Sequence, residues 1–360
     1  MPNLKTDEGG PVINIGINGF GRIGRLVLRR VIHLRENGNL RINVAAINTR
    51  GMSPEYIAYL LKHDTTHGIL KSSIGYTLDS IVIGNGPSKT EIKISICANP
   101  ESINWEVYGV EYVCESTGAF LTIDTAGKHI NRTCGAKYVV ISAPPKDTSI
   151  PMYVVGVNDS EYNNDTIVSN ASCTTNCLAP LAKVLHEKYG IVEGLVTTIH
   201  ANTASQAVVD GSARGKKDWR VARASGSNII PTSTGAAKAV GKVIPELEGK
   251  LTGMAFRVPI NNISVVDLTC RFKHSTESHE ALLEFLKLVG GSNNVIGYTE
   301  EQCVSSDFMG DTHSCTIDLN SCISLNNHFV KIVAWYDNEM GYAARLVDLI
   351  LVMAEKNSKK

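Results

Sequence analysis

Short apolar runs and amphipathic stretches alternate in the first part of the chain. Residues 12–18 form an apolar, β-branched run bounded by glycines, which predicts a buried strand. A stretch with helical spacing follows, and residues 42–48 form a second apolar run. This order predicts a βαβ unit, and the runs at 111–114 and 138–142 predict further strands of the same parallel sheet. The apolar positions of the predicted helix are Leu26, Val27, Val31 and Ile32.

The pattern changes in the second part of the chain, where apolar and polar residues alternate along most of the runs. Such alternation is typical of antiparallel strands with one covered face, so we expect a second domain of the α+β type. A polar, glycine-rich segment at 202–227 shows little periodicity. The predicted helices are 178–189, 236–243 and 343–356, and the predicted strands are 194–200, 251–258, 264–272 and 329–335.

Length and composition fit a globular protein of about two domains. The chain has 360 residues, of which 43% are hydrophobic and 19% charged, and 35 basic residues balance 35 acidic ones. A net charge of zero gives no reason to expect nucleic acid or an anionic membrane as the main partner. One local basic cluster is either a solvated loop or the neighbour of an anionic ligand. It consists of Arg214, Lys216, Lys217, Arg220 and Arg223.

Nine scattered cysteines, an odd number without Cys-x2-Cys spacing, indicate neither a disulfide framework nor a zinc site. We therefore expect no metal and a reducing, cytoplasmic environment. Residues 1–8 lack the apolar core of a signal peptide, and no apolar run approaches the roughly 18 residues of a membrane span. No membrane association is expected.

The segment Gly19-Phe20-Gly21-Arg22-Ile23-Gly24 matches the pattern Gly-x-Gly-x-x-Gly between a predicted strand and a predicted helix. In this context the first glycine makes a tight turn, the second admits a pyrophosphate, and the third packs the helix on the strand. The helix N-terminus then binds the phosphates. A dinucleotide site is the favoured interpretation, and a tight turn without a ligand is the alternative.

The second predicted strand ends in Asn48-Thr49-Arg50, where an NAD-binding fold usually has an acidic residue that binds the ribose 2′-hydroxyl. No carboxylate stands here to repel a 2′-phosphate, and Arg50 adds a positive charge. These residues favour acceptance of NADP. The alternative is that Arg50 faces water and NAD binds.

Cys173 precedes a predicted helix, and a helix N-terminus lowers the pKa of a thiol by stabilising the thiolate. His200 ends the next predicted strand, and we expect consecutive parallel strand ends to bring it to the thiol. A Cys–His pair is an activated nucleophile with its base. From spacing alone, a buried cysteine and a core histidine remain an equal alternative.

Five segments in order resemble motifs of the phosphorylating glyceraldehyde-3-phosphate dehydrogenases, and the resemblance covers nearly the whole chain. The segments are 17–25, 169–180, 233–238, 251–259 and 335–339. This family implies an α/β protein: a Rossmann-type parallel-sheet domain over 1–172 and an α+β catalytic domain with a mostly antiparallel sheet over 173–337. The C-terminal helix, within 338–360, would return to and complete the cofactor domain. Segment 202–227 would be the family's S-shaped loop, which lines the cofactor site of a neighbouring subunit in a homotetramer.

The resemblance also implies a reaction. Cys173 would attack the aldehyde of D-glyceraldehyde 3-phosphate, and His200 would act as the base while a hydride passes to NAD or NADP. Inorganic phosphate would then cleave the thioester and give 1,3-bisphosphoglycerate, in a reversible reaction that serves glycolysis or gluconeogenesis. The implied contacts to the substrate and phosphate are Ser172, Thr174, Thr203, Thr234, Gly235 and Arg257. The implied cofactor contacts are Asn18, Gly19, Phe20, Gly21, Arg22, Ile23, Thr49, Arg50, Ser142, Ser212, Asn338 and Tyr342.

The chain departs from the family pattern at the cofactor site. Thr49 stands where NAD-using members have Asp, and Ser212 stands where they usually have Pro. Members of the chloroplast type that accept NADP have Ser there, so both changes predict that NADP is accepted or preferred. Ala98 replaces an Arg that usually lies near the adenine.

Other functions remain as alternatives. The related erythrose-4-phosphate dehydrogenases release an acid by hydrolysis and need no phosphate. A Cys–His hydrolase would need neither the nucleotide loop nor Asn338. An RNA-binding or redox-sensing protein could use the same fold, but the sequence shows no basic stripe or aromatic platform for RNA.

Overall fold

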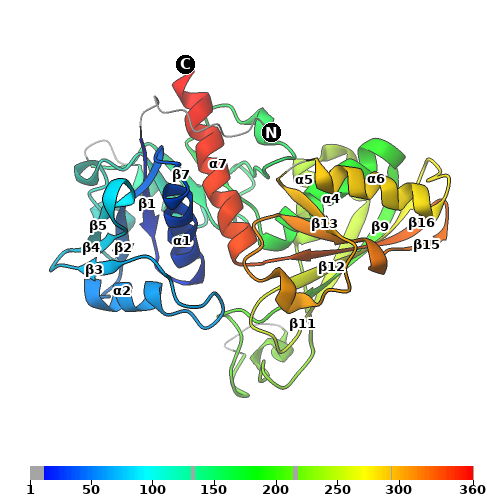
Figure 1. The fold of residues 1–360 in the computed structure, drawn as a ribbon, viewed down its shortest axis with the longest axis horizontal. Coiled ribbons are helices and arrows are strands. Elements are labelled where there is room, and N and C mark those ends of the chain that lie inside the picture. Colours follow the sequence, from blue (N-terminus) through cyan, green and yellow to red (C-terminus); the bar gives the residue numbers. More distant parts are fainter. Residues whose placement is uncertain (1–11, 131–133, 214–217, 293, 360) are drawn as a thin grey trace. The chain divides into compact units, whose positions relative to one another are not determined.

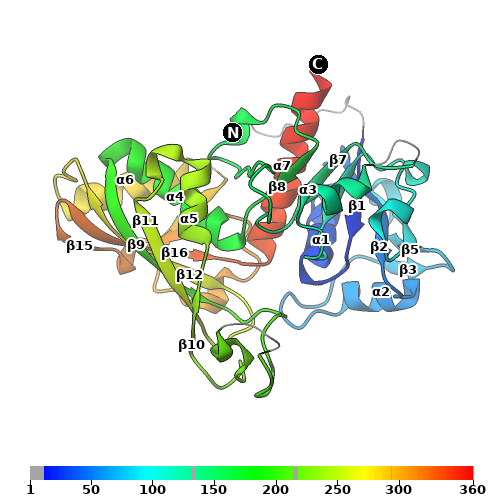
Figure 2. The same cartoon turned by 180° about the vertical axis from the view of Figure 1, so that it is seen from behind.

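A computed structural model describes residues 12–130, 134–213, 218–292 and 294–359. The chain forms two compact units (Figures 1 and 2). The first comprises Met1–Val155, Asp159–Ala171 and Ala343–Lys360, and the second comprises Gly156–Asn158 and Ser172–Tyr342. As predicted, this is an α/β protein with a mostly parallel sheet in one unit and a mostly antiparallel sheet in the other.

The first unit is built on an eight-stranded sheet with the order β3-β4-β5-β2-β1-β6-β7-β8. Six strands pair in parallel, while β4 pairs antiparallel with β3 and with β5 at one edge. The sequence pattern predicted β1, β2, β6 and β7, but not β3, β4, β5 or β8. The strands are β1 (Ile13–Asn18), β2 (Ile42–Thr49), β3 (Ile74–Tyr76), β4 (Ser80–Ile83), β5 (Thr90–Ile96), β6 (Tyr112–Glu115), β7 (Tyr138–Ile141) and β8 (Ile167–Ser169).

Helix α1 (Arg22–Glu36) begins directly after the glycine turn and buries the four apolar positions that predicted it. Helix α2 (Pro54–Lys62) was missed by the pattern, although its start has clear local causes. The Ser53 hydroxyl accepts a hydrogen bond from the Tyr56 N–H, and Pro54 occupies the first helical position. The unit also contains α3 (Ile123–Ala126) and most of α7 (Met340–Ser358).

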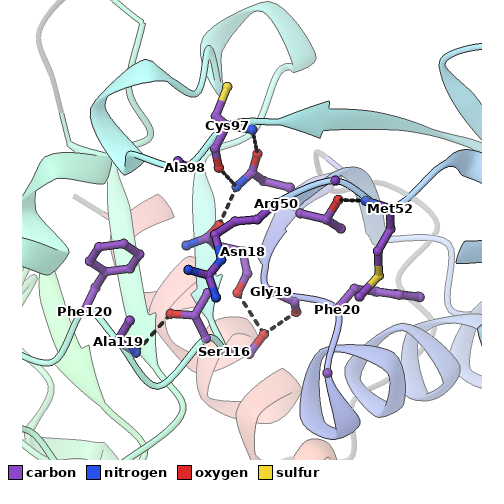
Figure 3. A pocket seen from close by; sticks show the side chains of 15 residues that line it. Asn18, Gly19, Phe20, Arg50, Met52, Cys97, Ala98, Ser116, Ala119 and Phe120 are labelled. Carbon is purple, nitrogen blue, oxygen red and sulfur yellow. Dashed lines mark hydrogen bonds between the residues drawn. The ribbon is translucent and has the colours of Figure 1, made fainter.

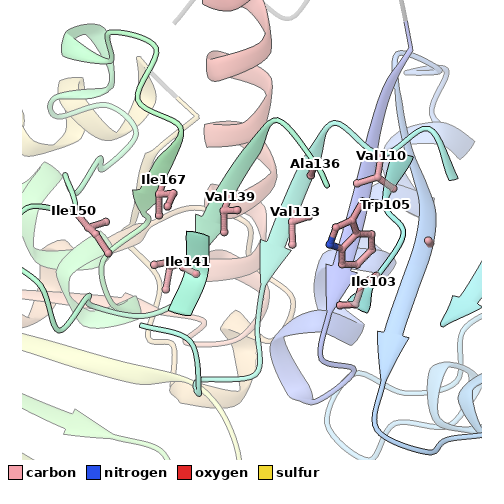
Figure 4. Packing of buried hydrophobic residues seen from close by; sticks show 11 residues of the cluster. Ile103, Trp105, Val110, Val113, Ala136, Val139, Ile141, Ile150 and Ile167 are labelled. Atoms are coloured by element: carbon pink, nitrogen blue, oxygen red, sulfur yellow. The ribbon is translucent and has the colours of Figure 1, made fainter. Parts of the chain in front are cut away.

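Part of the core of the first unit lies between strands β6–β8 and the segments that connect the strands (Figure 4). Trp105 is fully buried there, and a Cβ atom on Gly16 would lie 2.5 Å from its ring. Strand β1 therefore needs a glycine at this point so that the indole can pack against its backbone. The cluster comprises Ala46, Ile103, Trp105, Val110, Val113, Ala126, Ala136, Val139, Ile141, Ile150 and Ile167.

The second unit has a mixed sheet with the order β10-β11-β9-β12-β16-β14-β13, and β15 pairs with β16. Most pairs are antiparallel, but β11 runs parallel to β9 and β13 parallel to β14. Buried and partly exposed residues alternate along β12 and β16, as expected for strands with one covered face. The strands are β9 (Ile191–His200), β10 (Ile230–Ser233), β11 (Leu251–Arg257), β12 (Ser264–Phe272), β13 (Ile296–Thr299), β14 (Cys315–Asp318), β15 (Ile323–Asn326) and β16 (Phe329–Tyr336).

Three helices pack against this sheet: α4 (Cys173–Tyr189), α5 (Ala236–Val243) and α6 (His279–Gly291) (Figure 1). The predicted start of α4 at residue 178 was wrong. The helix begins five residues earlier, because Ser172 caps it by accepting the Thr175 N–H and the polar residues that follow form its first turn. Cys173 is therefore the first residue of α4 rather than a residue ahead of it.

Candidate functional site

The glycine motif lies where the strand order of the first unit changes direction. Strand β1 pairs with β2 on one side and with β6 on the other, so the loops after β1 and β6 diverge. Ligands of open α/β sheets bind at such a switch point, outside the carboxyl ends of the strands. A cavity of about 390 Å³ lies there (Figure 3). Its lining residues are Asn18, Gly19, Phe20, Gly21, Asn48, Thr49, Arg50, Gly51, Met52, Cys97, Ala98, Ser116, Thr117, Ala119 and Phe120.

The three glycines of the motif fit a dinucleotide for different reasons. Gly19 has a φ angle of 94°, which favours glycine in the tight turn. A Cβ atom on Gly24 would lie 2.1 Å from the carbonyl oxygen of Gly19, so the helix start and the turn approach too closely for a side chain. A Cβ atom on Gly21 would meet nothing within 4 Å. Gly21 is also exposed and lines the cavity, so a pyrophosphate can approach the backbone there.

The structure brings only some of the predicted cofactor residues to this cavity. Asn18 to Gly21, Thr49 and Arg50 line it, whereas Arg22, Ile23 and Ser142 do not. The Arg22 guanidinium instead forms two hydrogen bonds with Asp64, at 2.6 and 3.2 Å. Arg22 thus fastens the start of α1 to the chain after α2.

The residues at the end of β2 give the cavity a positive rather than a negative character. The hydroxyl of Thr49 is buried and accepts the Met52 N–H, so it holds the turn after the strand. Arg50 is exposed on the cavity wall. No aspartate or glutamate is among the fifteen lining residues. Ala98, in place of the family's Arg, also lines the cavity, together with Cys97 and Phe120, which the sequence did not single out.

In the second unit, the Sγ atom of Cys173 lies 3.5 Å from the Nε2 atom of His200. The two residues do not meet through consecutive parallel strand ends, as we had expected, because β8 and β9 belong to different sheets. Instead α4 carries the chain away from Cys173, and β9 brings it back over ten residues to His200. A helix followed by an adjacent strand therefore places the pair.

The other ring nitrogen of His200 fixes the orientation of the imidazole. Nδ1 lies 2.8 Å from the carbonyl oxygen of Ala201, and the Nη1 atom of Arg257 lies 3.0 Å from the same oxygen and 2.7 Å from Nδ1. The Ala201 oxygen can only accept a hydrogen bond and the Arg257 guanidinium can only donate one, so the two contacts of Nδ1 call for opposite tautomers. We assign the proton to Nδ1, because in that tautomer Nδ1 and Arg257 both donate to the Ala201 oxygen. This tautomer leaves the Nε2 lone pair directed at the thiol, as a base requires.

Burial controls the protonation of the pair. It raises the pKa of the Cys173 thiol, although Arg257, the Thr174 hydroxyl and the N–H groups of Cys173 and Thr174 act in the opposite direction. The predicted lowering of the thiol pKa is therefore wrong, since desolvation outweighs the helix start. Burial and the nearby Arg257 lower the pKa of His200 to about 4. His200 is consequently a neutral base at neutral pH.

Two residues near the pair, Tyr336 and Ser264, were not predicted from the sequence. The Tyr336 ring stands edge-on to His200 with 6.0 Å between ring centres, and its buried hydroxyl lies 2.9 Å from the hydroxyls of both Thr174 and Thr198. Ser264 accepts the Ala201 N–H at 3.0 Å and donates to Asn338 at 2.8 Å. Each is distant in sequence from the residue that it supports, so no local pattern reveals it.

The residues predicted to bind phosphate lie on separate elements of the second unit. Ser172 caps α4, and Gly235 and Thr234 precede α5, where the Thr234 hydroxyl accepts the Ala236 N–H. Thr203 is held by Gln206, whose side-chain oxygen accepts the Thr203 N–H at 2.9 Å. Arg257 ends β11, directly beside His200 on β9. Helix N-termini, hydroxyls and an arginine are suitable donors for a dianion.

The segment 202–227 is partly described. Ser212 is exposed, and two of its basic residues form exposed ion pairs, Arg220 with Asp218 and Arg223 with Asp210. The other three residues of the predicted basic cluster, Arg214, Lys216 and Lys217, lie outside the described residues. The two pairs agree with a solvated loop at these positions.

Two further kinds of site are absent from the described residues. No helix there is long and apolar enough to span a bilayer. Within the same ranges, no three or more His, Cys, Asp or Glu side chains gather in a way that could hold a metal ion.

A Rossmann-type unit with a glycine cradle and a second unit with a Cys–His pair are typical of a nicotinamide-dependent dehydrogenase with a cysteine nucleophile. Comparison with family models agrees. Residues 13–123 match the NAD-binding domain of glyceraldehyde 3-phosphate dehydrogenase, and residues 172–338 match its C-terminal domain. The chain belongs to the glyceraldehyde 3-phosphate dehydrogenase family, and its cofactor is NAD or NADP.

The matches to individual relatives cover nearly the whole chain. A testis-specific glyceraldehyde-3-phosphate dehydrogenase of Rattus norvegicus is 52% identical over 345 residues, which cover 95% of this chain and 76% of that protein. The glyceraldehyde-3-phosphate dehydrogenase 2 of Caenorhabditis elegans is 51% identical over 351 residues, or 96% and 99% of the two chains. A chloroplastic glyceraldehyde-3-phosphate dehydrogenase of Arabidopsis thaliana is 53% identical over 343 residues, or 94% and 78%.

Proposed function

We propose that the protein catalyses the reversible, phosphate-dependent oxidation of D-glyceraldehyde 3-phosphate to 1,3-bisphosphoglycerate through a thioester on Cys173. The observation that carries the proposal is the 3.5 Å distance between the Cys173 Sγ and His200 Nε2 atoms in a protein of this family. Arg257, beside His200, suits an anionic substrate. The glycine turn after β1 suits a dinucleotide.

In the first half of the reaction, the Cys173 sulfur attacks the aldehyde carbon. The thiol proton passes through the Nε2 atom of His200 to the carbonyl oxygen, and a thiohemiacetal results. NAD(P) bound in the first unit would supply the acceptor for the C1 hydrogen, which would leave as hydride. His200 takes the hydroxyl proton in the same step and becomes an imidazolium. The aldehyde carbon is thereby oxidised to a thioester on Cys173.

In the second half, an oxygen of hydrogen phosphate attacks the thioester carbon. The carbon–sulfur bond breaks, and the departing sulfur receives the proton from His200, which restores the neutral pair. The proton of the hydrogen phosphate is released. We assign Ser172 and Thr174 at the start of α4, and Thr234 and Gly235 before α5, to the attacking phosphate. We assign Thr203 and Arg257 to the phosphate of the substrate.

Substitution of the nucleophile tests this mechanism. Cys173→Ser should abolish oxidation of glyceraldehyde 3-phosphate, because a serine hydroxyl is a far weaker nucleophile than a thiol beside the same base. Cofactor binding should persist, since its cavity lies in the first unit. Cys177, fully buried one turn later on α4, gives a control in Cys177→Ser that should keep measurable activity. Substantial turnover by Cys173→Ser would refute the covalent route.

We further propose that NADP is accepted or preferred. The absence of acidic side chains among the fifteen residues lining the described cavity, and the exposed Arg50 on its wall, support this assignment. A 2′-phosphate would meet a hydroxyl residue and a cation at the end of β2 rather than a carboxylate. Ser212, exposed on the 202–227 segment, would contribute from a neighbouring subunit.

A homotetramer is the assembly that we propose, in line with the resemblance. Large apolar side chains of the second unit that are more than 60% exposed support an interface there. These side chains are Leu195, Val208, Val209, Trp219, Ile229, Leu288 and Leu325. Light scattering should give four times the chain mass of 38.9 kDa. The nine free thiols support a reducing, cytoplasmic location, which cell fractionation would test.

A further inference from the structure

Beside the cofactor cavity, three polar side chains form a buried row across the first sheet. Asn18 of β1 lies opposite Asn48 of β2 and opposite Glu115 of β6. Asn48 donates from Nδ2 to the Asn18 Oδ1 atom at 2.8 Å, and Asn18 donates from Nδ2 to the Glu115 Oε2 atom at 2.6 Å. All three are at most 3% exposed. The row ends on a carboxylate that the proposed reaction does not use.

Glu115 accepts four hydrogen bonds. Its Oε2 atom accepts from Asn18 and, at 3.0 Å, from the Nε2 atom of His129, while Oε1 accepts from the N–H at 2.8 Å and the hydroxyl of Thr117. Neither lysine nor arginine forms an ion pair with it within the described ranges. An ionised carboxylate has about four acceptor sites, so these donors use its whole capacity.

In the hydrogen bond between His129 and Glu115, His129 is the donor and Glu115 the acceptor. The Trp105 indole donates from Nε1 to the Nδ1 atom of His129 at 3.1 Å, and an indole N–H has no acceptor function. Nδ1 is therefore unprotonated, and Nε2 carries the hydrogen that is donated to Glu115. All four partners of Glu115 are donors, and only an acceptor with two free oxygens satisfies them.

The groups fixed by Glu115 line the cavity on two sides. Asn18 ends β1 directly before the glycine turn, and Thr117 belongs to the loop after β6. Asn48 extends the row of hydrogen bonds to Cys97, which also lines the cavity. The Asn48 side chain accepts the Cys97 N–H at 2.9 Å and donates to the Cys97 carbonyl at 3.0 Å. One buried carboxylate thus connects the walls that would hold a dinucleotide.

We propose that Glu115 is a positioning residue of the cofactor site, which holds Asn18 and Thr117 in the geometry that binds NAD(P). The proposal rests on the proposed function only in that the cavity binds the cofactor. Glu115 acts through its two neighbours and touches no reacting atom. Its removal should therefore weaken cofactor binding while the chemistry at Cys173 continues.

The test is Glu115→Gln, which keeps the shape but replaces one oxygen with an NH2 group that faces two donors. The dissociation constant for the cofactor, measured by fluorescence titration without substrate, should rise about tenfold or more. The KM for the cofactor should rise in parallel, whereas kcat at saturating cofactor, the KM for the aldehyde and the alkylation rate of Cys173 should not change. Glu111→Gln is the matched control, because Glu111 precedes the same strand and forms an exposed pair with Lys137.

A second pair of variants covers the case that Glu115→Gln does not fold. Thr117→Val removes the hydroxyl donor and should weaken cofactor binding, and Thr117→Ser should recover most of that loss. The proposal is overturned if both Glu115→Gln and Thr117→Val bind the cofactor with wild-type affinity, or if they lower only the amount of active enzyme. If the wild type binds NAD(P) but oxidises no glyceraldehyde 3-phosphate, the proposed function fails while the role of Glu115 is still measured.

Discussion

The Nε2 atom of His200 faces the sulfur of Cys173 across 3.5 Å, and burial moves the pKa values of the two groups in opposite directions. A raised thiol pKa and a histidine pKa of about 4 make a neutral pair at neutral pH. Charge then develops only when the sulfur attacks, and the Nδ1 bond to Ala201 holds the imidazole in place for it. The pair is therefore set up for proton transfer during the reaction.

Removal of this base should show its contribution directly. His200→Asn should lower kcat roughly 10²- to 10⁴-fold at pH 7, because the thiol proton then has no acceptor. The loss should shrink as the pH rises, since the thiol ionises by itself in alkaline solution. Stopped-flow measurement of cofactor reduction between pH 7 and pH 10 checks this. A pH-independent loss would show that His200 does not act as the base.

The 202–206 turn offers a test of substrate recognition. The Asn202 Oδ1 atom accepts from the Gln206 amide at 3.2 Å, which turns the Gln206 oxygen toward the Thr203 N–H. Asn202→Val should release this arrangement and raise the KM for glyceraldehyde 3-phosphate roughly three- to tenfold. The KM for glyceraldehyde, which lacks the phosphate, should not change. Asn228→Val serves as the control, because the Asn228 side chain donates instead to the Ala224 carbonyl oxygen, at 2.8 Å. Equal effects on both aldehydes would exclude a role in phosphate binding.

Cofactor choice should depend on Thr49 and Ser212. We expect the wild-type kcat/KM for NADP to lie within about a hundredfold of that for NAD, and Thr49→Asp to lower the NADP value roughly tenfold or more through like-charge repulsion. Ser212→Pro should add to the loss, and neither change should lower the NAD value to the same extent. Steady-state kinetics with both cofactors decides. A wild-type preference for NAD above a hundredfold would contradict the assignment.

The Arg22–Asp64 pair predicts a dependence of stability on pH. Burial alone would raise the pKa of Asp64, but hydrogen bonds from Arg22 and from the N–H groups of His67 and Thr66 lower it to about 2, against an ordinary value of 3.8. Its folded pKa is thus depressed, so the stabilisation is full above about pH 4 and disappears as the pH falls toward 2.

Asp64→Asn should therefore cost about 2 kcal/mol of unfolding free energy at pH 7 and progressively less below pH 4. Urea titrations between pH 7 and pH 3 measure the difference from the wild type. Asp79→Asn is the control, because its ion pair with Lys93 is exposed and should contribute little at any pH. A constant difference over the whole range would refute the assignment to this carboxylate.

The sequence predicted the parts of the fold that periodicity encodes. The strand–glycine–helix–strand order gave β1, α1 and β2, and the alternation in the second half gave β12 and β16. Helix α2 was missed because its start depends on the local cap at Ser53 and on Pro54 rather than on a periodic pattern. The early start of α4 was missed because its first turn is polar.

The candidate site was predictable only as far as its motifs are local. Cys173, His200 and the glycines were found because each has a distinctive setting along the chain. The supporting residues were not, since Glu115 meets Asn18 across 97 positions and Tyr336 meets Thr174 across 162. The direction of the thiol pKa also depends on burial, which follows from tertiary packing rather than from the helix start.

The central claim is that oxidation stores its energy in a thioester on Cys173 that phosphate then cleaves. The most direct measurement mixes enzyme, cofactor and glyceraldehyde 3-phosphate without phosphate, follows cofactor reduction in a stopped-flow instrument and identifies the acylated residue by mass spectrometry. We predict a burst of about one reduced cofactor per active site, an acyl group on Cys173, and turnover that resumes when phosphate is added. Sustained turnover without phosphate, or an unmodified Cys173 after the burst, would contradict the account.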